Sequence, residues 1–544
     1  MPYSRQPSDY EPVTSSSSRR ASLREGEGED RAGVWPDATA PARRAHTAEN
    51  DDDSGRLLAK RTPHPPAQIS DTPDAETLDT RAAQDKLACK LKRGHLISFA
   101  GLFVFTVVLY FRPYELIPAL SSLTSMAYFV ALATVVIFVP SQFAIEGTFT
   151  YRPREVNLVL LLSVAALLSM PFALNPLEAW DTFNKEFIKA VVMFIVMVNV
   201  VRTERRLKAL FWLALAVSAF LCVHAIQDYS SGRLALDGQR IAGLIGGMFG
   251  NPNDLALHLV TMIPIAFGLM LTTRNPLMKL LYAACAVLMV IGNMITFSRG
   301  GFLGLMAVMC VLAWKLGRRN RLVVVGMFVL MVGFFAFAPG DYTSRLGSIV
   351  DHSRDAFGSA GQRQELLIRS IIVSLKNPVF GVGMGNFHTV SIRELVSHNA
   401  YTQVSAEMGI AAMVIYIMFI VTPLKRLRQI ERETFATRKG SHFYYLAIGL
   451  QGSLIGFMVN SFFASVAYQW YVYYLVGYAI CLRRLYEAEV GHKVVPQKKQ
   501  KNQGTLAQNP EDISGKADGD PSFDASGEDT LDGQRRPAFG EAAR

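Results

Sequence analysis

The chain has 544 residues, half of them hydrophobic, and a formal net charge of +10. Its Lys and Arg residues gather in short polar segments between apolar runs of about twenty residues, the length that crosses a bilayer. This distribution argues against nucleic acid as a partner and indicates a multi-spanning membrane protein whose basic loops set its orientation.

The two ends of the chain are polar. Residues 1–95 are rich in Ser, Pro, Asp, Arg and Ala, and residues 486–544 have a similar character. Such segments cannot bury enough apolar surface to offset their ordering entropy, so both are predicted to be disordered tails. Because residues 1–95 contain no apolar signal-peptide core, the first apolar run is expected to be an uncleaved signal-anchor.

The region between the tails, residues 96–485, is predicted to be an all-α polytopic membrane domain. Twelve apolar runs are expected to span the membrane, and the two shortest need help from flanking residues to do so. The expected spans are residues 96–111, 120–140, 156–173, 187–201, 207–227, 252–272, 278–297, 301–317, 321–338, 399–424, 443–463 and 467–485.

Basic clusters fall at alternate ends of these spans. They read CKLKRGH, YRPRE, VRTERRLK, TTRNPLMK, KLGRRNR, LKRLRQIERETFATRKG and LRRLYEAEVGHK. Under the positive-inside rule, these loops and both tails face the cytoplasm. The large loop 339–398, between the ninth and tenth spans, then lies on the outer, periplasmic side. Its stretch QRQELLIRSIIVSLKN is predicted to be an amphipathic helix at the membrane surface, followed by a Gly-rich turn, GVGMGNF.

Three arginines on the outer face suggest an anion site. Arg299 lies in a very short turn, Arg240 precedes the sixth span, and Arg363 lies in the amphipathic stretch. The planar guanidinium binds phosphate through two hydrogen bonds and stays charged. The alternative is solvated loop charge or contact with lipid headgroups, and this alternative is preferred for the other loop arginines, Arg345, Arg354, Arg369 and Arg393.

The segment SHNAYTQVSAEMGI leads into the tenth span. His398 is expected at the water–lipid boundary, where a histidine can accept a proton from a hydroxyl group. Tyr401 shares its helical face. The alternative for His398 is a helix-capping or interfacial role. Glu407, roughly 12 Å further along the helix at 1.5 Å per residue, is predicted to pair with an arginine such as Arg299.

The segment GMFGNPNDLALHL opens the sixth span. Asn251 can cap the helix, and Asn253 and Asp254 lie in its first turn. Capping alone is the alternative to a functional role. No P-loop is present, and the outer loops contain no carboxylate cluster for Mg²⁺ or Mn²⁺. None of the five cysteines has CxxC spacing, so neither a zinc site nor a disulfide framework is predicted. No metal or other cofactor is expected.

Four segments in order carry a resemblance to a known family. They read RIAGLIGGMFGNPNDLALHL, TFSRGGFLGL, QRQELLIRSIIVSLKNPVFGVGMGNF and HNAYTQVSAEMGIAA. Together they resemble the O-antigen ligase and O-antigen polymerase family, in motif detail over residues 235–415 and in span pattern over residues 96–485. The segment YFRPYELIPAL is also similar to a subset of the family associated with exopolysaccharide or protein O-glycosylation systems.

The resemblance implies an enzyme of the bacterial inner membrane. Members of the family transfer a glycan from undecaprenyl pyrophosphate to a hydroxyl acceptor at the periplasmic face, with inversion and without metal. The acceptor is lipid A–core in ligases of lipopolysaccharide synthesis, a further repeat in polymerases, and a protein Ser or Thr in O-oligosaccharyltransferases. The expected partners are therefore the lipid-linked glycan, the acceptor and membrane lipids.

By motif, the resemblance assigns pyrophosphate binding to Arg240, Arg299 and Arg363, and the catalytic base to His398. Leu367 stands where the family often has an aromatic residue after the loop arginine. Asn251, Asn253, Asn399, Tyr401 and Glu407 are expected to support the site. Two other classes of function remain open: a transporter of lipid-linked oligosaccharides, and a membrane scaffold whose tails recruit partners. Polar residues at one face rather than at the bilayer midplane argue against the transporter.

Overall fold

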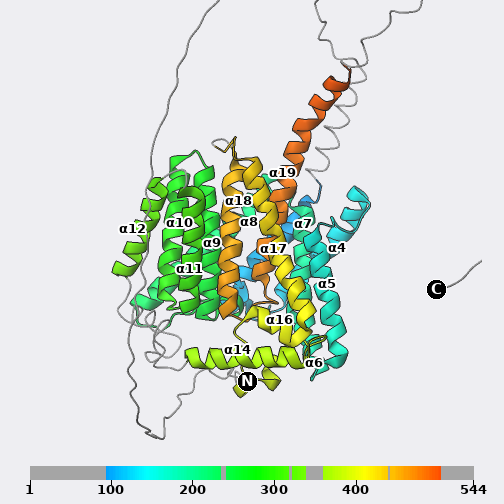
Figure 1. The fold of residues 1–544 in the computed structure, drawn as a ribbon, viewed down its shortest axis with the longest axis vertical. Coiled ribbons are helices and arrows are strands. Elements are labelled where there is room, and N and C mark those ends of the chain that lie inside the picture. The colour runs from blue at the N-terminus through cyan, green and yellow to red at the C-terminus, as the bar shows by residue number, and fades with distance from the viewer. Residues whose placement is uncertain (1–93, 234–239, 318–320, 338–358, 439–440, 504–544) are drawn as a thin grey trace, which may run out of the picture. The chain divides into compact units, whose positions relative to one another are not determined.

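The computed structural model describes residues 94–233, 240–317, 321–337, 359–438 and 441–503. These residues form helices joined by turns and short loops, without a strand among them (Figure 1). The predictions for most of the N-terminal tail, for the end of the C-terminal tail and for the first part of the large loop lie outside the described residues.

The long helices follow the predicted spans closely. They are α2 (Leu96–Phe111), α4 (Met126–Glu146), α5 (Arg154–Ser169), α7 (Ile188–Val200), α8 (Glu204–Ser230), α9 (Pro252–Thr272), α10 (Pro276–Ile295), α11 (Arg299–Gly317), α12 (Arg321–Phe337), α17 (Ile410–Glu433), α18 (His442–Asn460) and α19 (Trp470–Gln503). Within the described ranges, nine helices are long and apolar enough to cross a membrane. The all-helical, multi-spanning prediction is confirmed, and the count of twelve spans stays a prediction.

Shorter helices lie between the spans. They are α3 (Pro113–Leu116), α6 (Pro176–Thr182), α14 (Ser359–Lys376), α15 (Phe387–Val390) and α16 (Ala400–Met408). The amphipathic stretch of the large loop forms α14, as predicted, and Figure 1 shows this helix running across the direction of the spans. The tenth predicted span is interrupted: α16 ends at Met408, and α17 begins at Ile410.

A close helix pair lies at the centre of the bundle. α9 packs against α10, α11 and α18. Its contact with α18 is tight, because a Cβ atom on Gly449 would meet the Pro264 carbonyl oxygen at 2.6 Å. Small residues at such contacts let two backbones approach closely, and this approach supplies the packing energy of helices in lipid.

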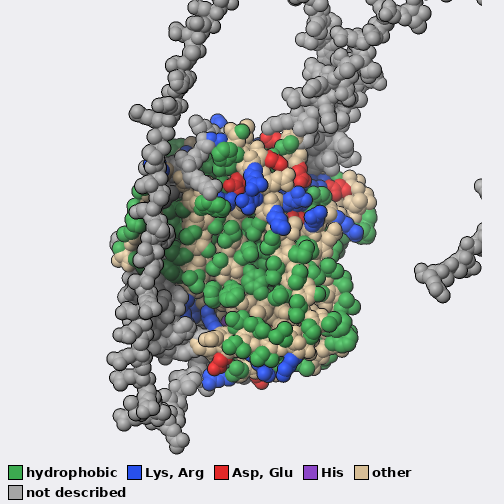
Figure 2. All heavy atoms as spheres, in the orientation of Figure 1, with side chains coloured by type: hydrophobic (Ala, Val, Ile, Leu, Met, Phe, Trp, Pro, Cys, Tyr) green, Lys and Arg blue, Asp and Glu red, His purple; other side chains and the backbone are tan. Residues whose placement is uncertain are grey.

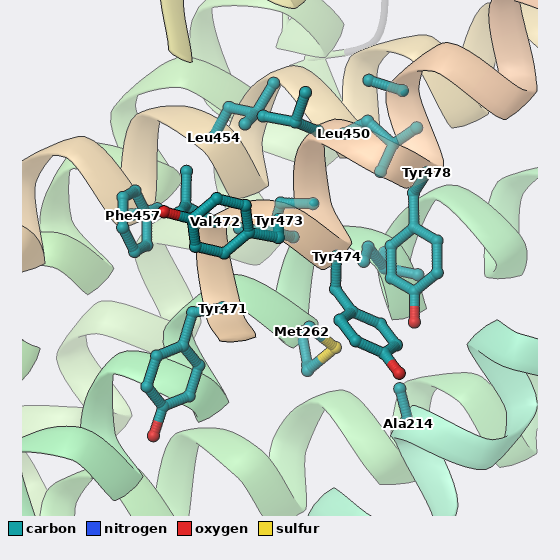
Figure 3. Packing of buried hydrophobic residues seen from close by; sticks show 14 of the residues in the cluster. Ala214, Met262, Leu450, Leu454, Phe457, Tyr471, Val472, Tyr473, Tyr474 and Tyr478 are labelled. Atoms are coloured by element: carbon teal, nitrogen blue, oxygen red, sulfur yellow. The ribbon is translucent and has the colours of Figure 1, made fainter. Parts of the chain in front are cut away.

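Tyrosines of α19 fill much of the core (Figure 3). Tyr473, Tyr474 and Tyr478 are fully or almost fully buried, and they belong to the same cluster as Leu450 and other residues of α18. A buried phenol needs a hydrogen-bond partner. Tyr474 has the Thr106 hydroxyl at 2.8 Å, and Tyr473 donates to the Ala467 carbonyl at 3.0 Å. These bonds tie the last span to α2 and to its own lead-in.

Charge is concentrated at the ends of the bundle. Figure 2 shows a broad band of hydrophobic side chains, with most Lys, Arg, Asp and Glu residues gathered near one end. At that end, Glu146 forms ion pairs of 2.8 Å with both Arg202 and Arg484.

The chain divides after Glu487 into two units. α19 continues past residue 485, the predicted end of the membrane domain. Every candidate site residue lies in the first unit.

Candidate active site

Arg240 and the start of α9 are joined by hydrogen bonds. Asn251 caps α9, and its side chain accepts from the Asn253 N–H at 2.8 Å. The Asn253 Oδ1 atom accepts from Arg240 Nη2 at 2.9 Å and from Ser298 Oγ at 2.8 Å. Arg240, only 3% exposed, also donates from Nε to the Thr296 carbonyl at 3.4 Å. Asn253 therefore connects Arg240 with the turn that carries Arg299.

Arg299 is the first residue of α11 and is half-buried. The residue before it, Ser298, accepts the Gly301 N–H on its hydroxyl oxygen at 3.1 Å, as a helix-capping serine does. The first N–H groups of a helix carry partial positive charge, and this charge adds to that of the guanidinium. The SRGG segment thus places an arginine and a helix N-terminus at the same point.

His398 lies just before α16 in a left-handed backbone conformation, with φ of +50°. The next residue, Asn399, caps α16 by accepting the N–H groups of Tyr401 and Thr402 at 2.9 and 3.1 Å. Non-glycine residues rarely adopt positive φ, and they tend to do so at functional sites. In the HNAY motif, the asparagine therefore caps the helix, and the histidine lies immediately before the helix N-terminus.

The imidazole of His398 is neutral near pH 7. Burial, and to a smaller extent the positive charge of Arg363, lower the pKa of His398 to about 3. Arg363, which is half-buried, is the charged residue that acts on the imidazole. Arg363 lies in α14, which packs against α16, the helix that begins just after His398.

The connection between α18 and α19 touches both parts of the site. A Cβ atom on Gly300, next to Arg299, would meet the Phe463 Cβ at 3.1 Å. Ser465 lies at 3.1 Å from the hydroxyl of Ser397, the neighbour of His398. Sequence reasoning missed this connection. The small and polar residues after Asn460, in SFFAS, were the available signal.

Tyr401 is held in the packing of α16 rather than presented at the helix mouth. Its hydroxyl donates to the Met458 carbonyl at 3.0 Å and accepts from Ser461 Oγ at 3.2 Å. These bonds attach α16 to the end of α18. Among the supporting residues, Tyr401 thus has a structural role in the described geometry.

Glu407 does not pair with Arg299, and that expectation is wrong. Its Oε2 atom accepts from the Tyr468 hydroxyl at 2.7 Å and from the Gly385 N–H at 2.9 Å. The Gly-rich turn folds back onto the end of α16 and supplies the N–H groups that the sequence could not place there. Burial raises the pKa of Glu407 to about 7, against the opposing effect of these hydrogen bonds.

Two buried polar atoms lie in the segment that follows His398 in the chain. Within the described part of the chain, Asn399 Nδ2 and Gln403 Oε1 are buried and lack a hydrogen-bond partner. The two residues are four positions apart, on one face of α16. Sequence reasoning did not single out Gln403, because a glutamine in a mixed helix carries no distinctive pattern. A donor and an acceptor of this kind match the two hydrogen-bonding capacities of a hydroxyl group.

All these residues lie at the same end of the spans, where α9 and α11 begin and α10 and α18 end. Arginines at this end suit the binding of an anion, and a neutral imidazole suits the acceptance of a proton. Within the described residues, no group of three or more His, Cys, Asp or Glu side chains is placed to hold a metal ion.

Comparison with known proteins gives a family match for part of the chain. Residues 284–417 match the family model described as O-antigen ligase, a stretch that includes Arg299, Arg363 and His398. No curated protein matches the chain at a significant level. The match confirms the resemblance carried by the sequence motifs. It also supports, in general terms, the prediction that the protein is an enzyme. Residues 284–417 of this multi-pass membrane protein are thus similar to the O-antigen ligase family.

Proposed function

We propose that the protein is an inverting glycosyltransferase at the periplasmic face of the bacterial inner membrane. It moves a glycan from undecaprenyl pyrophosphate to a hydroxyl acceptor. The observation that carries the proposal is the position of Arg240, Arg299, Arg363 and His398 at one end of the spans, within or next to the residues that match the family.

Arg240, Arg299 and Arg363 bind the pyrophosphate of the donor. When the bond between the anomeric carbon and the phosphate oxygen breaks, negative charge develops on the leaving group. Positively charged groups fixed in place beforehand stabilise that charge. Asn253 and Thr296 fix the Arg240 guanidinium, and the helix N-terminus adds to the effect of Arg299.

His398 accepts the proton of the acceptor hydroxyl. The hydroxyl oxygen attacks the anomeric carbon from the face opposite the pyrophosphate, so the configuration at that carbon inverts. Undecaprenyl pyrophosphate leaves with the electron pair. A histidine whose pKa is about 3 is a weak base in the empty site. A bound pyrophosphate offsets the charge of Arg363, so the basicity of His398 rises when the donor is in place.

The proposal is tested by comparing lipid-linked and transferred glycan in cells that carry the wild-type protein, His398→Ala, Arg299→Ala or no protein. We expect both variants to lose transferred glycan while intact lipid-linked repeats accumulate. The length of the wild-type product separates a ligase from a polymerase. Normal transfer by variants present at normal levels would contradict the proposal, and a chemically unchanged donor moved across the membrane would favour a transporter.

A further inference from the structure

The loop that carries Arg240 is contacted by a segment far away in the sequence. α2 ends at Phe111, and α3 follows after Arg112. Glu115, in α3, accepts the Gly246 N–H on Oε2 at 2.7 Å. Its other carboxylate oxygen, Oε1, accepts from Arg112 Nη1 at 2.6 Å. The carboxylate thus joins the Arg112 guanidinium to the backbone of the loop before α9.

Arg112 also lies directly against that loop. Gly247 has φ of +62°, and a Cβ atom there would overlap the Arg112 guanidinium. Only glycine combines this backbone conformation with so close an approach. Arg112 itself has φ of +41° and precedes a proline, a strained combination that persists where the surroundings fix it.

The rest of the loop is closed by its own bonds. The Gly243 N–H donates to the Phe249 carbonyl at 2.8 Å, and the Tyr471 hydroxyl donates to the Met248 carbonyl. The two ends of the loop meet where Arg240 donates to Asn253. Arg112 and Glu115 contact the middle of this closed loop, at Gly246 and Gly247, within the segment that the bond between Gly243 and Phe249 closes.

We infer that Arg112 and Glu115 are positioning residues for the binding of the donor pyrophosphate: they hold residues 240–251 in the conformation that presents Arg240. The inference rests on the proposed function. Neither side chain has a described contact with Arg240, so the effect passes through the backbone at Gly246 and Gly247. Arg112 and Glu115 are about 27% and 30% exposed, and the contacts therefore lie at the edge of the loop.

Four variants separate this role from general destabilisation. Glu115→Ala removes both hydrogen bonds, whereas Glu115→Gln keeps an oxygen that can accept the Gly246 N–H. Gly247→Ala displaces the Arg112 guanidinium. Gly232→Ala is the matched control, because Gly232 has φ of +68° and open space around its Cα. Both alanines incur the same backbone strain, and only Gly247→Ala meets the guanidinium.

Two measurements are made on the full-length protein in lipid nanodiscs. The first is amide hydrogen exchange over residues 240–251, which does not depend on any activity. We expect about tenfold faster exchange in Glu115→Ala and Gly247→Ala, the effect of losing one charge-assisted hydrogen bond. Glu115→Gln is expected to restore most of the protection, and Gly232→Ala to leave it unchanged.

The second measurement is glycan transfer from a lipid pyrophosphate-linked donor, with Arg240→Ala in the same assay. We expect kcat/KM to fall about tenfold in Glu115→Ala, mainly through a higher KM for the donor. Unchanged exchange in Glu115→Ala would overturn the inference. Faster exchange with normal transfer would also overturn it, while loss of transfer in Arg240→Ala still supports the proposed function. Normal transfer in Arg240→Ala would instead overturn the assignment of Arg240 on which the inference rests.

Discussion

Asn253 accepts a hydrogen bond from Arg240 Nη2 at 2.9 Å, and so attaches the first residue of the 240–251 loop to the first turn of α9. The same Oδ1 atom accepts from Ser298, one residue before Arg299. An amide oxygen can serve two donors without adding charge. A single neutral side chain thus orients one arginine and the turn of another, and adds no negative charge beside either of them.

This relationship predicts that two substitutions of Asn253 affect different quantities, the KM for the donor and the stability of the protein. Asn253→Asp keeps an acceptor for both donors but places a negative charge on Arg240. We expect normal thermal stability and a KM for the donor that rises about tenfold. Asn253→Ala removes the acceptor that Arg240 and Ser298 share and is expected to cost about 1–3 kcal/mol of stability. An Asn253→Asp variant with unchanged KM would show that Arg240 does not contact the donor.

Under the proposed function, we expect His398 and Arg363 to set the dependence of transfer on pH. Because burial and Arg363 lower the pKa of His398 to about 3, the imidazole of the free enzyme stays neutral throughout the ordinary pH range. We expect kcat/KM to show no acid limb near 6.5, the usual pKa of histidine. In Arg363→Gln the electrostatic cause is lost and burial remains, so an acid limb moves upward but stays below 6.5.

Arg369→Gln is the control for this profile. Arg369 lies on the same helix as Arg363, is exposed, and donates to the Val390 carbonyl at 2.8 Å. We expect its pH profile to match that of the wild-type enzyme. A shift as large as that of Arg363→Gln would mean that the net charge of α14, and not the local charge of Arg363, controls the imidazole.

The raised pKa of Glu407 predicts that the protein loses stability as pH rises. Its folded pKa, about 7, lies above its ordinary value of 4.5 because of burial. The folded state therefore holds a proton that the unfolded state releases between these values. The stabilisation is complete below about 4.5 and is lost as pH rises through about 7, a change of the order of 3 kcal/mol.

Substitutions of Glu407 test this prediction through melting temperatures from pH 5 to pH 8. Glu407→Gln copies the neutral carboxyl group and keeps an oxygen for Tyr468 and Gly385, so its melting temperature should depend less on pH. Glu407→Ala is expected to be less stable at every pH. If Glu407→Gln kept the full pH dependence of the wild-type protein, another group would be responsible.

The break between α16 and α17 depends on Gly409. Its φ is +91°, and a Cβ atom there would overlap the Val379 carbonyl oxygen. We expect Gly409→Ala to cost roughly 3 kcal/mol, the sum of backbone strain and steric overlap. Gly147→Ala is the control, since Gly147 has φ of +67° and nothing near its Cα, and it is expected to cost only about 1 kcal/mol. Equal losses in thermal unfolding would mean that the Val379 contact is unimportant.

Local sequence patterns predicted much of the fold. The runs that form α2, α9 and α12 have almost the same bounds in the sequence and in the structure. Such runs are recognisable because a helix in lipid must satisfy its own backbone and present apolar side chains, and both requirements are local. The amphipathic period of α14 was recognisable for the same reason.

The interruption at Gly409 was not predictable in this way. The apolar pattern continues from α16 into α17, and only the approach of the Gly-rich turn, from residues 381–387, makes the break favourable. The same approach of the Gly-rich turn brings the Gly385 N–H to Glu407. A buried carboxylate signals that it needs a partner. Whether that partner is an arginine or a set of N–H and O–H groups depends on which segment arrives beside it.

The sequence by itself determined the class of this protein, an all-helical membrane protein that resembles the O-antigen ligase family, and the residue types of its candidate site. Periodicity, length and short motifs are properties of neighbouring residues, so they can be interpreted without coordinates. The tertiary structure alone decided that Asn253 joins Arg240 to Ser298, that Tyr468 bonds to Glu407, and that Glu115 reaches Gly246. These contacts join segments that are far apart in the chain, and packing between helices, rather than any local preference, brings them together.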